Sequence, residues 1–182
     1  MRKWMRILII AMVGLSMIMI VSCETVDSSA KSCYAADRAQ IEDLQARYLF
    51  ALDFGDIDTY LSTFTEDGVL DIVGMKWQGH EDIRGIIESA FKGGDKDAKP
   101  YPPTGRHNIT NIVIKVDGDT ATGTAYWFHY GNNNPERKAV LDSYGHYEDE
   151  MVKIDGQWFF TKRVIYNEQE ADWIAPSENP SW

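Results

Sequence analysis

Two Asp-Gly turn signals in the second half of the chain constrain its fold more than any other feature of the sequence. Asp117-Gly118 and Asp155-Gly156 each separate two stretches that are rich in β-branched and aromatic residues. Such a pair is typical of a β-hairpin, because aspartate and glycine tolerate the positive φ values of a tight turn. The sequence therefore predicts a four-stranded antiparallel meander, with an Asn-rich loop over 131–138 and strands over 108–116, 120–130, 140–154 and 157–166.

The segment before the meander reads mainly as helix. Apolar residues recur at helical spacing over 38–54 and again over 83–91, which is typical of two amphipathic helices. Asp56 is a favourable N-cap for a short helix between them. Asp37 and Gln40 predict a capping box at the start of the first helix.

One strand, over residues 69–73, is expected among the helices, and a loop rich in glycine, proline and charge occupies 92–106. Long loops in compact domains are often lids or mouths of a site. Helices grouped before strands predict an α+β fold, in which three helices pack on one face of a curved sheet.

The N-terminus is expected to be a targeting segment. Positive residues among the first six precede an almost uninterrupted apolar stretch over 7–21. That stretch is short for a bilayer-spanning helix, which needs about 20 apolar residues, and the pattern is typical of a secretory signal. It ends in Ile20-Val21-Ser22-Cys23, which resembles a bacterial lipobox and so implies acylation of Cys23. An uncleaved anchor and ordinary cleavage after Ala30 are the alternatives.

These features divide the chain into a lipoprotein signal peptide over 1–22, a flexible tether over 23–36, a domain over 37–167 and a C-terminal tail over 168–182. Cys33 lies in the tether and has no expected catalytic role. The expected location is the bacterial cell envelope, with the domain anchored by lipid on the periplasmic or another extracytoplasmic face.

The charge of the chain excludes some partners. The formal net charge is −10, and removal of residues 1–22, which carry three positive and no negative charges, makes it −13. So acidic a domain offers no basic face to nucleic acid or to anionic lipid. Contact with a membrane is therefore expected through the lipid anchor only.

Four stretches, in this order, resemble the SnoaL-like branch of the nuclear transport factor 2-like superfamily: ARYLFALDFGDIDTYLSTFTEDGVLDI, WQGHEDIRGII, GRHNITNIVIKVDGDTATGTAY and GHYEDEMVKIDGQWFFTKRVI. The resemblance covers residues 37–167. It implies a cone-shaped α+β barrel, with three N-terminal helices on a curved, mainly antiparallel sheet that encloses a pocket, and a homodimer through the open sheet face. Family members include dehydratases, a dehydrochlorinase, isomerases and domains without known catalysis, so the fold does not select a reaction.

The resemblance places Asp53 and His107 at the positions of an Asp-His pair in the dehydratase-like members. An imidazole is a base near neutral pH, and a carboxylate on its other nitrogen fixes the tautomer and stabilises the imidazolium. Such a pair removes a proton from carbon while a leaving group departs. The alternatives are a solvated turn for Asp53 and a core or rim histidine for His107. Periodicity does not say which face of the strand carrying His107 meets the interior.

Further candidates follow from the same resemblance. His129 and Tyr147 fall near pocket positions and are candidates to donate a hydrogen bond to a substrate oxygen. A surface histidine and a packing tyrosine are the alternatives for these two. Tyr48 lies on the buried stripe of the first helix, where a core role is the alternative to substrate binding. Arg163 is expected to line the pocket or to pair with an acid such as Asp149.

Asp71 supports a different chemistry. It lies in VLDIVG, close to where the ketosteroid isomerase-like members place a proton-shuttling aspartate. An aspartate in an apolar strand is a candidate base for an enolisable ketone.

The sequence contains no spacing typical of a metal site, no phosphate-binding glycine loop and no GxSxG motif, so we expect no metal and no cofactor. The predicted ligand is a small hydrophobic or polycyclic molecule. One hypothesis is a cofactor-free lyase or isomerase that uses Asp53 and His107. The other is a non-catalytic ligand-binding or assembly domain of the same fold.

Overall fold

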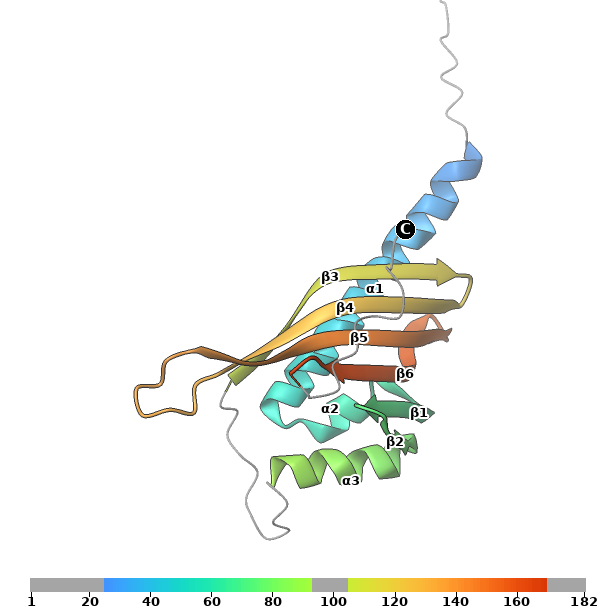
Figure 1. Ribbon diagram of the computed structural model, residues 1–182. Helices are drawn as coiled ribbons and strands as arrows, with labels where there is room; N and C mark the ends of the chain where they lie inside the picture. The colour runs from blue at the N-terminus through green and yellow to red at the C-terminus, as the bar shows by residue number, and fades with distance from the viewer. Residues whose placement is uncertain (1–24, 93–104, 170–182) are drawn as a thin grey trace, which may run out of the picture.

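The computed structural model describes residues 25–92 and 105–169. The predicted signal peptide, Cys23 and most of the predicted C-terminal tail lie outside these residues. Its helices are α1 (Thr25–Phe54), α2 (Ile57–Leu61) and α3 (Gly79–Phe91). α1 passes behind the sheet, and α3 lies beside the edge of the sheet that is formed by residues 64–78 (Figure 1). Asp56 caps α2 as predicted, because its carboxylate accepts a hydrogen bond from the Thr59 backbone N–H at 3.1 Å.

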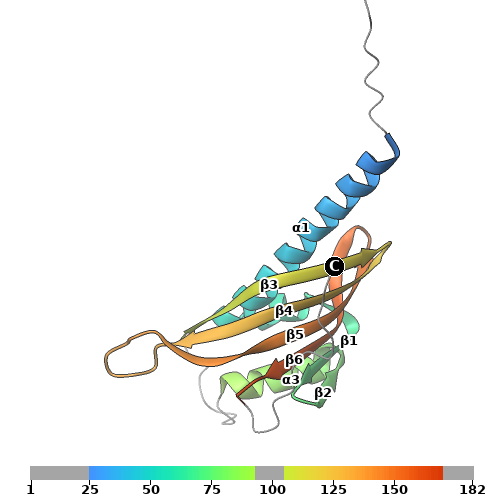
Figure 2. The same cartoon turned by 45° about the horizontal axis from the view of Figure 1, so that its top comes forward.

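The strands form one curved six-stranded sheet (Figure 2). They are β1 (Phe64–Ile72), β2 (Met75–Gln78), β3 (Gly105–Asp117), β4 (Thr120–Gly131), β5 (Val140–Ile154) and β6 (Gln157–Asn167). The order across the sheet is β2-β1-β6-β5-β4-β3. β3 to β6 are the predicted antiparallel meander, whereas β1 pairs parallel to β6 and antiparallel to β2. The α+β prediction is confirmed, but the sheet is open and does not close into a barrel.

α1 begins earlier than the sequence predicted. The prediction was a flexible tether over 23–36 and a helix start capped by Asp37, but the helix already begins at Thr25. The segment from Thr25 to Ala36 contains neither proline nor glycine, so nothing in it stops a helix. Asp37 does not cap; its Oδ1 accepts hydrogen bonds from Lys153 Nζ at 2.6 Å and Trp158 Nε1 at 3.1 Å. This carboxylate therefore fastens α1 to β5 and β6.

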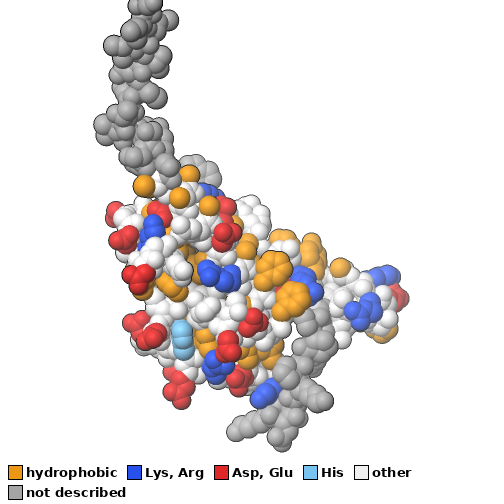
Figure 3. Space-filling view, turned by 180° about the vertical axis from the view of Figure 1, so that it is seen from behind, with side chains coloured by type: hydrophobic (Ala, Val, Ile, Leu, Met, Phe, Trp, Pro, Cys, Tyr) orange, Lys and Arg blue, Asp and Glu red, His pale blue; other side chains and the backbone are white. Residues whose placement is uncertain are grey.

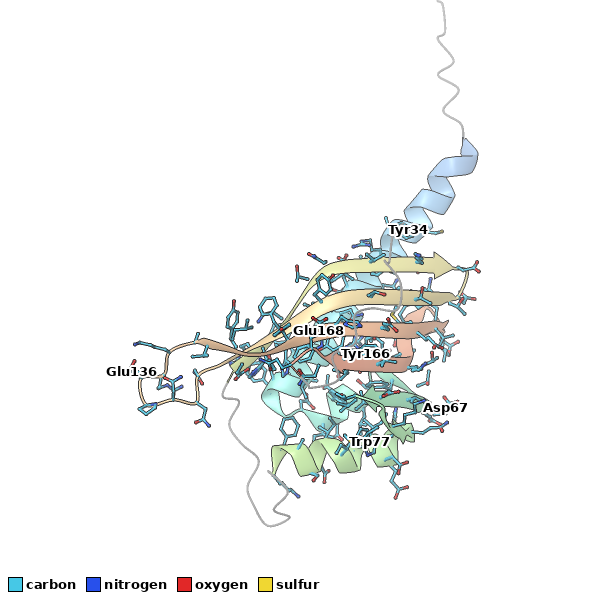
Figure 4. The ribbon with its side chains drawn as sticks, in the orientation of Figure 1. Tyr34, Asp67, Trp77, Glu136, Tyr166 and Glu168 are labelled. Atoms are coloured by element: carbon cyan, nitrogen blue, oxygen red, sulfur yellow. The ribbon has the colours of Figure 1, made fainter. Side chains whose placement is uncertain are left out.

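The core lies between α1 and the concave face of the sheet. The predicted apolar stripe of α1 is buried there, and on α3 the buried side chains are Ile83 and Ile87. Trp158 and Phe160 of β6 complete the same cluster. Tyr34, on the exposed part of α1, reaches β3 and donates to the Ile114 carbonyl at 3.3 Å (Figure 4). Within the described residues, no helix is long and apolar enough to span a membrane.

A β-bulge in β3 settles which strand face meets the interior. Thr110 pairs with Tyr126 and Val113 with Thr124, so β3 holds one residue more than β4 between these pairs. Asn111 is the extra residue and has a φ of 53°. Because the bulge shifts the alternation, Ile109 before it and Ile114 after it both face the core.

The connection between β4 and β5 projects well beyond the sheet (Figure 1). Glu136 lies at its tip (Figure 4). Seen from the helix side, apolar side chains gather near the base of the projection, and lysine and arginine side chains lie at its tip (Figure 3). At the base, Phe54 is 59% exposed and packs under the Arg106 guanidinium at 5.0 Å.

Candidate functional site

Asp53 and His107 are joined at the end of α1. His107 Nδ1 lies 2.6 Å from Asp53 Oδ1. The His107 backbone N–H also donates to the same carboxylate, at 3.0 Å to Oδ2 and 3.2 Å to Oδ1. These contacts fix both the main chain and the ring of His107 relative to Asp53. The separation that a dyad requires, about 2.6–3.2 Å, is present.

The two side chains differ in exposure in the way that a proton-transfer pair requires. The Asp53 side chain is 6% exposed, whereas the His107 side chain is 24% exposed. Because Nδ1 faces a carboxylate, it carries a proton in the neutral ring and leaves the lone pair on Nε2. The basic Nε2 thus belongs to His107, the more accessible of the two side chains, and the Asp53 carboxylate is shielded from water.

The end of α1 is an unfavourable position for the Asp53 carboxylate. It occupies the last turn of α1, where the helix dipole disfavours negative charge. Gly55 follows with a φ of 66°, which turns the chain away and leaves Asp53 facing β3. The hydrogen bonds from His107 supply the partners that the helix end does not.

A second histidine–carboxylate pair lies beside the first. His129 is directly opposite His107 on β4, and their ring centroids are 4.5 Å apart. His129 Nδ1 lies 2.6 Å from Asp142 Oδ1. The His129 side chain is 19% exposed and that of Asp142 is 47% exposed. His129 is one of the predicted site residues, whereas Asp142 is not. The sequence does not indicate Asp142, because its contact with His129 depends on the register shift between β4 and β5.

The deeper interior holds a fully buried ion pair. Arg163 Nε and Nη2 donate to the two Asp149 oxygens at 2.8 Å and 2.7 Å, which is one of the two roles predicted for Arg163. Gln45 on α1 completes the group: its amide nitrogen donates to Asp149 at 2.7 Å and its oxygen accepts from Arg163. Burial opposes the charge on Arg163, but the interactions with Asp149, Tyr48 and Tyr147 together outweigh burial and raise the arginine pKa. Among the residues that the structure describes, none accepts a hydrogen bond from Arg163 Nη1.

Aromatic rings surround this ion pair. The Arg163 guanidinium lies 4.1 Å from the ring centroids of Tyr48 and Phe160 and 4.2 Å from that of Tyr147. Burial raises the pKa of Tyr147 well above its ordinary value, so its phenol stays neutral and supplies no base. Trp127 stacks on Tyr147 at 5.8 Å and lies 6.2 Å from the His107 ring. An aromatic wall thus connects the buried arginine to the exposed imidazoles.

Asp71 lies apart from these groups. Its neighbours Leu70 and Ile72 face the core, so the Asp71 side chain belongs to the opposite face of the sheet. Its Oδ1 accepts a hydrogen bond from the Gly74 backbone N–H at 2.9 Å, and Lys76 Nζ lies 3.8 Å from its Oδ2. Asp71 thus stabilises the turn between β1 and β2 and does not share a site with His107.

The convex face holds a third paired histidine, which sequence analysis did not single out. His146 is buried, its Nδ1 lies 3.0 Å from Glu168 Oε1, and its ring stacks on Tyr166 at 4.3 Å. Tyr166 and Glu168 lie at the end of β6 (Figure 4). This pair is separated from His107 by the sheet itself. Among the described residues, no three His, Cys, Asp or Glu side chains are grouped to hold a metal ion.

Comparison with known proteins agrees with this architecture. The family model described as "SnoaL-like domain" matches residues 34–164. An uncharacterised protein of Mycobacterium tuberculosis is 26% identical over 146 residues, which cover 78% of this chain and 93% of that protein.

Two solved structures share the fold. A candidate scytalone dehydratase from Novosphingobium aromaticivorans is 22% identical with a TM-score of 0.62, over 82% of this chain and 96% of that one. A protein of Catenulispora acidiphila in complex with S-DNPA is 23% identical with a TM-score of 0.61, over 74% of this chain and 96% of that one.

Proposed function

Because the chain belongs to the SnoaL-like domain family and joins Asp53 to His107, we propose that it is a cofactor-independent lyase or isomerase of a small, largely apolar molecule. The single observation that carries the proposal is the 2.6 Å contact between a buried carboxylate and a partly exposed imidazole. The fold neighbours support the architecture alone, although one of them carries a dehydratase name and another a bound small molecule.

In the proposed reaction, His107 Nε2 removes a proton from a carbon atom next to a carbonyl group of the ligand. Asp53 stays ionised, holds Nδ1–H and stabilises the imidazolium that forms. The electron pair of the broken C–H bond moves towards the carbonyl oxygen. An isomerase returns the proton to another carbon, whereas a lyase expels a leaving group from the neighbouring carbon.

The surroundings favour an apolar ligand. Trp127 lies beside the His107 ring and stacks on Tyr147, and both belong to the buried core, against which Ile109 of β3 also packs. Aromatic and aliphatic walls with a few polar groups are typical of sites for small apolar molecules. The imidazoles of His107 and His129 are the polar groups that face such a ligand.

The proposal is tested with the full-length chain and one ketone probe, 4-hydroxy-4-phenylbutan-2-one. In D2O, the protein is expected to exchange deuterium into carbon 3 faster than buffer does, as followed by proton NMR. His107→Gln is expected to lower this exchange by roughly 10²–10⁴-fold, and Asp53→Asn to lower it substantially. His80→Gln is the control, because His80 contacts the Phe64 carbonyl outside the site. Exchange that is equal in the wild type and His107→Gln would contradict the proposed base.

A non-catalytic binding or assembly domain is the second candidate function. One observation favours it. Arg163 and its aromatic neighbours fill the deeper interior, so a ligand reaches only the partly exposed imidazoles of His107 and His129. For this function, the aromatic probe is expected to bind, with tryptophan fluorescence as the measurement. Its carbon 3 protons are then expected to exchange no faster than in buffer.

We further propose that the protein is a homodimer and is anchored in a bacterial cell envelope by lipid on Cys23. The dimer proposal is supported by the convex face of the sheet, where Tyr126 and Tyr144 are 47% and 41% exposed. A double substitution of these two tyrosines by lysine is expected to convert the dimer to a monomer in light scattering. A wild type that is already monomeric contradicts this proposal.

A further inference from the structure

The convex face of the sheet carries a histidine that is better covered than its position explains. His146 is 0% exposed, although it lies in β5 on the face that α1 and α3 leave free, since α1 passes behind the sheet and α3 lies beside its edge (Figure 1). We propose that the C-terminal segment, residues 170–182, packs on this face and covers His146. The sheet separates this contact from His107, so the inference does not depend on the proposed reaction.

The neighbouring strands shield His146 from the sides only. Tyr126 of β4 and Tyr166 of β6 are directly opposite it in register. Tyr166 stacks on the imidazole, with the ring centroids 4.3 Å apart and the planes inclined by 12°, but Tyr126 is 47% exposed. Tyr144, two residues before His146 and on the same face, is 41% exposed. A side chain among neighbours of this exposure reaches water unless a further layer lies on top of it.

The polar atoms of the His146–Glu168 pair also indicate a covering layer. His146 Nδ1 lies 3.0 Å from Glu168 Oε1, and the Glu168 side chain is only 15% exposed. The second ring nitrogen, Nε2, is buried and has no hydrogen-bond partner among the described residues. Buried polar atoms are nearly always paired in native structures, so the layer on top of His146 has to offer a polar group to Nε2. The peptide groups of a chain segment meet this requirement.

The described chain ends on the same face. The Glu168 backbone N–H donates to the Tyr144 carbonyl at 3.0 Å, and the Gln169 backbone N–H donates to Asn167 Oδ1 at 3.1 Å. The second hydrogen bond forms an Asx turn, which bends the chain directly after the last residue of β6. The Glu168 side chain contacts His146 at the same point. The remaining chain therefore starts beside β5, next to the face on which His146 lies.

The remaining segment has the length and the side chains for such a layer. Fully extended, residues 170–182 reach about 40 Å, whereas neighbouring strands lie only about 4.8 Å apart, so the segment is long enough to cross β6, β5 and β4. It contains Trp173, Ile174 and Trp182. Burial of these apolar side chains against the tyrosine rings of the convex face favours the contact, because it removes apolar surface from water.

A second copy of the chain does not explain the burial of His146. The side chain is already buried within a single chain. Tyr126 and Tyr144 lie beside it and keep exposures of 47% and 41%, so they remain available to a partner in the proposed homodimer. The C-terminal segment and the partner thus contact adjacent parts of one face.

Deuterium exchange at the imidazole C2 carbon, followed for each histidine by mass spectrometry, tests the inference in the full-length chain. In the wild type, His146 is expected to exchange more slowly than the partly exposed His107. The double variant Trp173→Ser, Ile174→Ser is expected to raise the His146 rate about tenfold, because exchange requires the segment to leave the face. The His107 rate is expected to stay unchanged. Ser177→Ala, a polar change in the same segment, is the matched control and is expected to change neither rate.

A chain that ends after Gln169 is the second variant, and it keeps every residue that the structure describes. Its His146 rate is expected to rise at least as much as in the double variant. The His107 rate and urea denaturation report whether the shortened chain is folded; if it is not, the double variant in the full-length chain decides. A His146 rate in the double variant that equals the wild-type rate would overturn the inference.

Contacts within the unaltered segment give an independent reading. Nuclear Overhauser effects are expected between the indole protons of Trp173 or Trp182 and the ring protons of Tyr166. These effects are expected to persist in the Tyr126→Lys, Tyr144→Lys variant, because they form within one chain. Effects that vanish in that variant would assign the cover to a second copy, and a wild type without them would show that the segment does not lie on this face. Either result overturns the inference.

Discussion

At Arg163 the fold keeps a positive charge in its interior. The side chain is fully buried, with Asp149 and Gln45 as hydrogen-bond partners and aromatic rings around the guanidinium. Removal of one partner of a buried ion pair leaves the other charge uncompensated, which costs more than the pair itself contributes.

Arg163→Met is therefore expected to lower the free energy of unfolding by about 3–5 kcal/mol, because it leaves the buried Asp149 carboxylate without a positive partner. The double variant with Asp149→Leu is expected to recover most of this loss. Urea denaturation measures both. Lys162→Met is the control, since the Lys162–Glu150 pair is exposed and contributes about 0.5 kcal/mol. A double variant as unstable as Arg163→Met would contradict the explanation.

Asp37 makes the stability of the fold depend on pH. The hydrogen bond from Lys153 lowers the pKa of the Asp37 carboxyl, and burial opposes this only in part. A group whose pKa is lower in the folded state stabilises the fold above its unfolded value of about 4, and this contribution is lost as the pH falls through the folded value.

Asp37→Asn is thus expected to destabilise the protein at pH 7 by about 1 kcal/mol, a modest figure because Lys153 is partly exposed. The difference from the wild type is expected to shrink as the pH falls below about 4. Thermal melts between pH 7 and pH 3 measure it. A difference that stays constant over this range contradicts the assigned ion pair.

At the scale of elements, the bulge in β3 decides which side chains meet the interior. Asn111 has a φ of 53°, where a β-branched residue is strained and glycine is not. Asn111→Gly is expected to leave the melting temperature nearly unchanged. Asn111→Val is expected to cost roughly 1–2 kcal/mol in the free energy of unfolding, as measured by urea denaturation. Equal stability of the two variants would contradict the positive φ assigned to residue 111.

The same bulge shows what the sequence could and could not predict. Turn residues and apolar spacing predicted the four-stranded meander and α3, because these are local signals. The face of His107 was not predictable, since one extra residue exchanges the two faces of β3. The pairing of β1 with β6 was also missed, because it joins segments far apart in the chain. Asp53 and His107 were named through a family resemblance, whereas Asp142 required knowledge of strand register.

At the scale of the whole molecule, the sequence predicts that lipid on Cys23 anchors the protein to a membrane, and Cys23 lies outside the described residues. Cys23→Ala is expected to move the full-length protein from the membrane fraction to the soluble fraction of cells that make it, because the anchor is proposed to be lipid alone. Cys33→Ala is the control, since Cys33 is an exposed free cysteine of α1. Fractionation with mass spectrometry measures this. A Cys23→Ala protein that stays in the membrane fraction contradicts lipid anchorage.

The position of β6 has a consequence for how the chain is made. β6 is the last strand in the sequence, yet it lies between β1 and β5 in the sheet. A chain emerging from the ribosome therefore carries β1 paired with β2 at most, and β1 lacks its second partner until residue 167 has been made. The sheet cannot assemble in the order of synthesis, so the nascent polypeptide stays incompletely folded until translation is nearly finished.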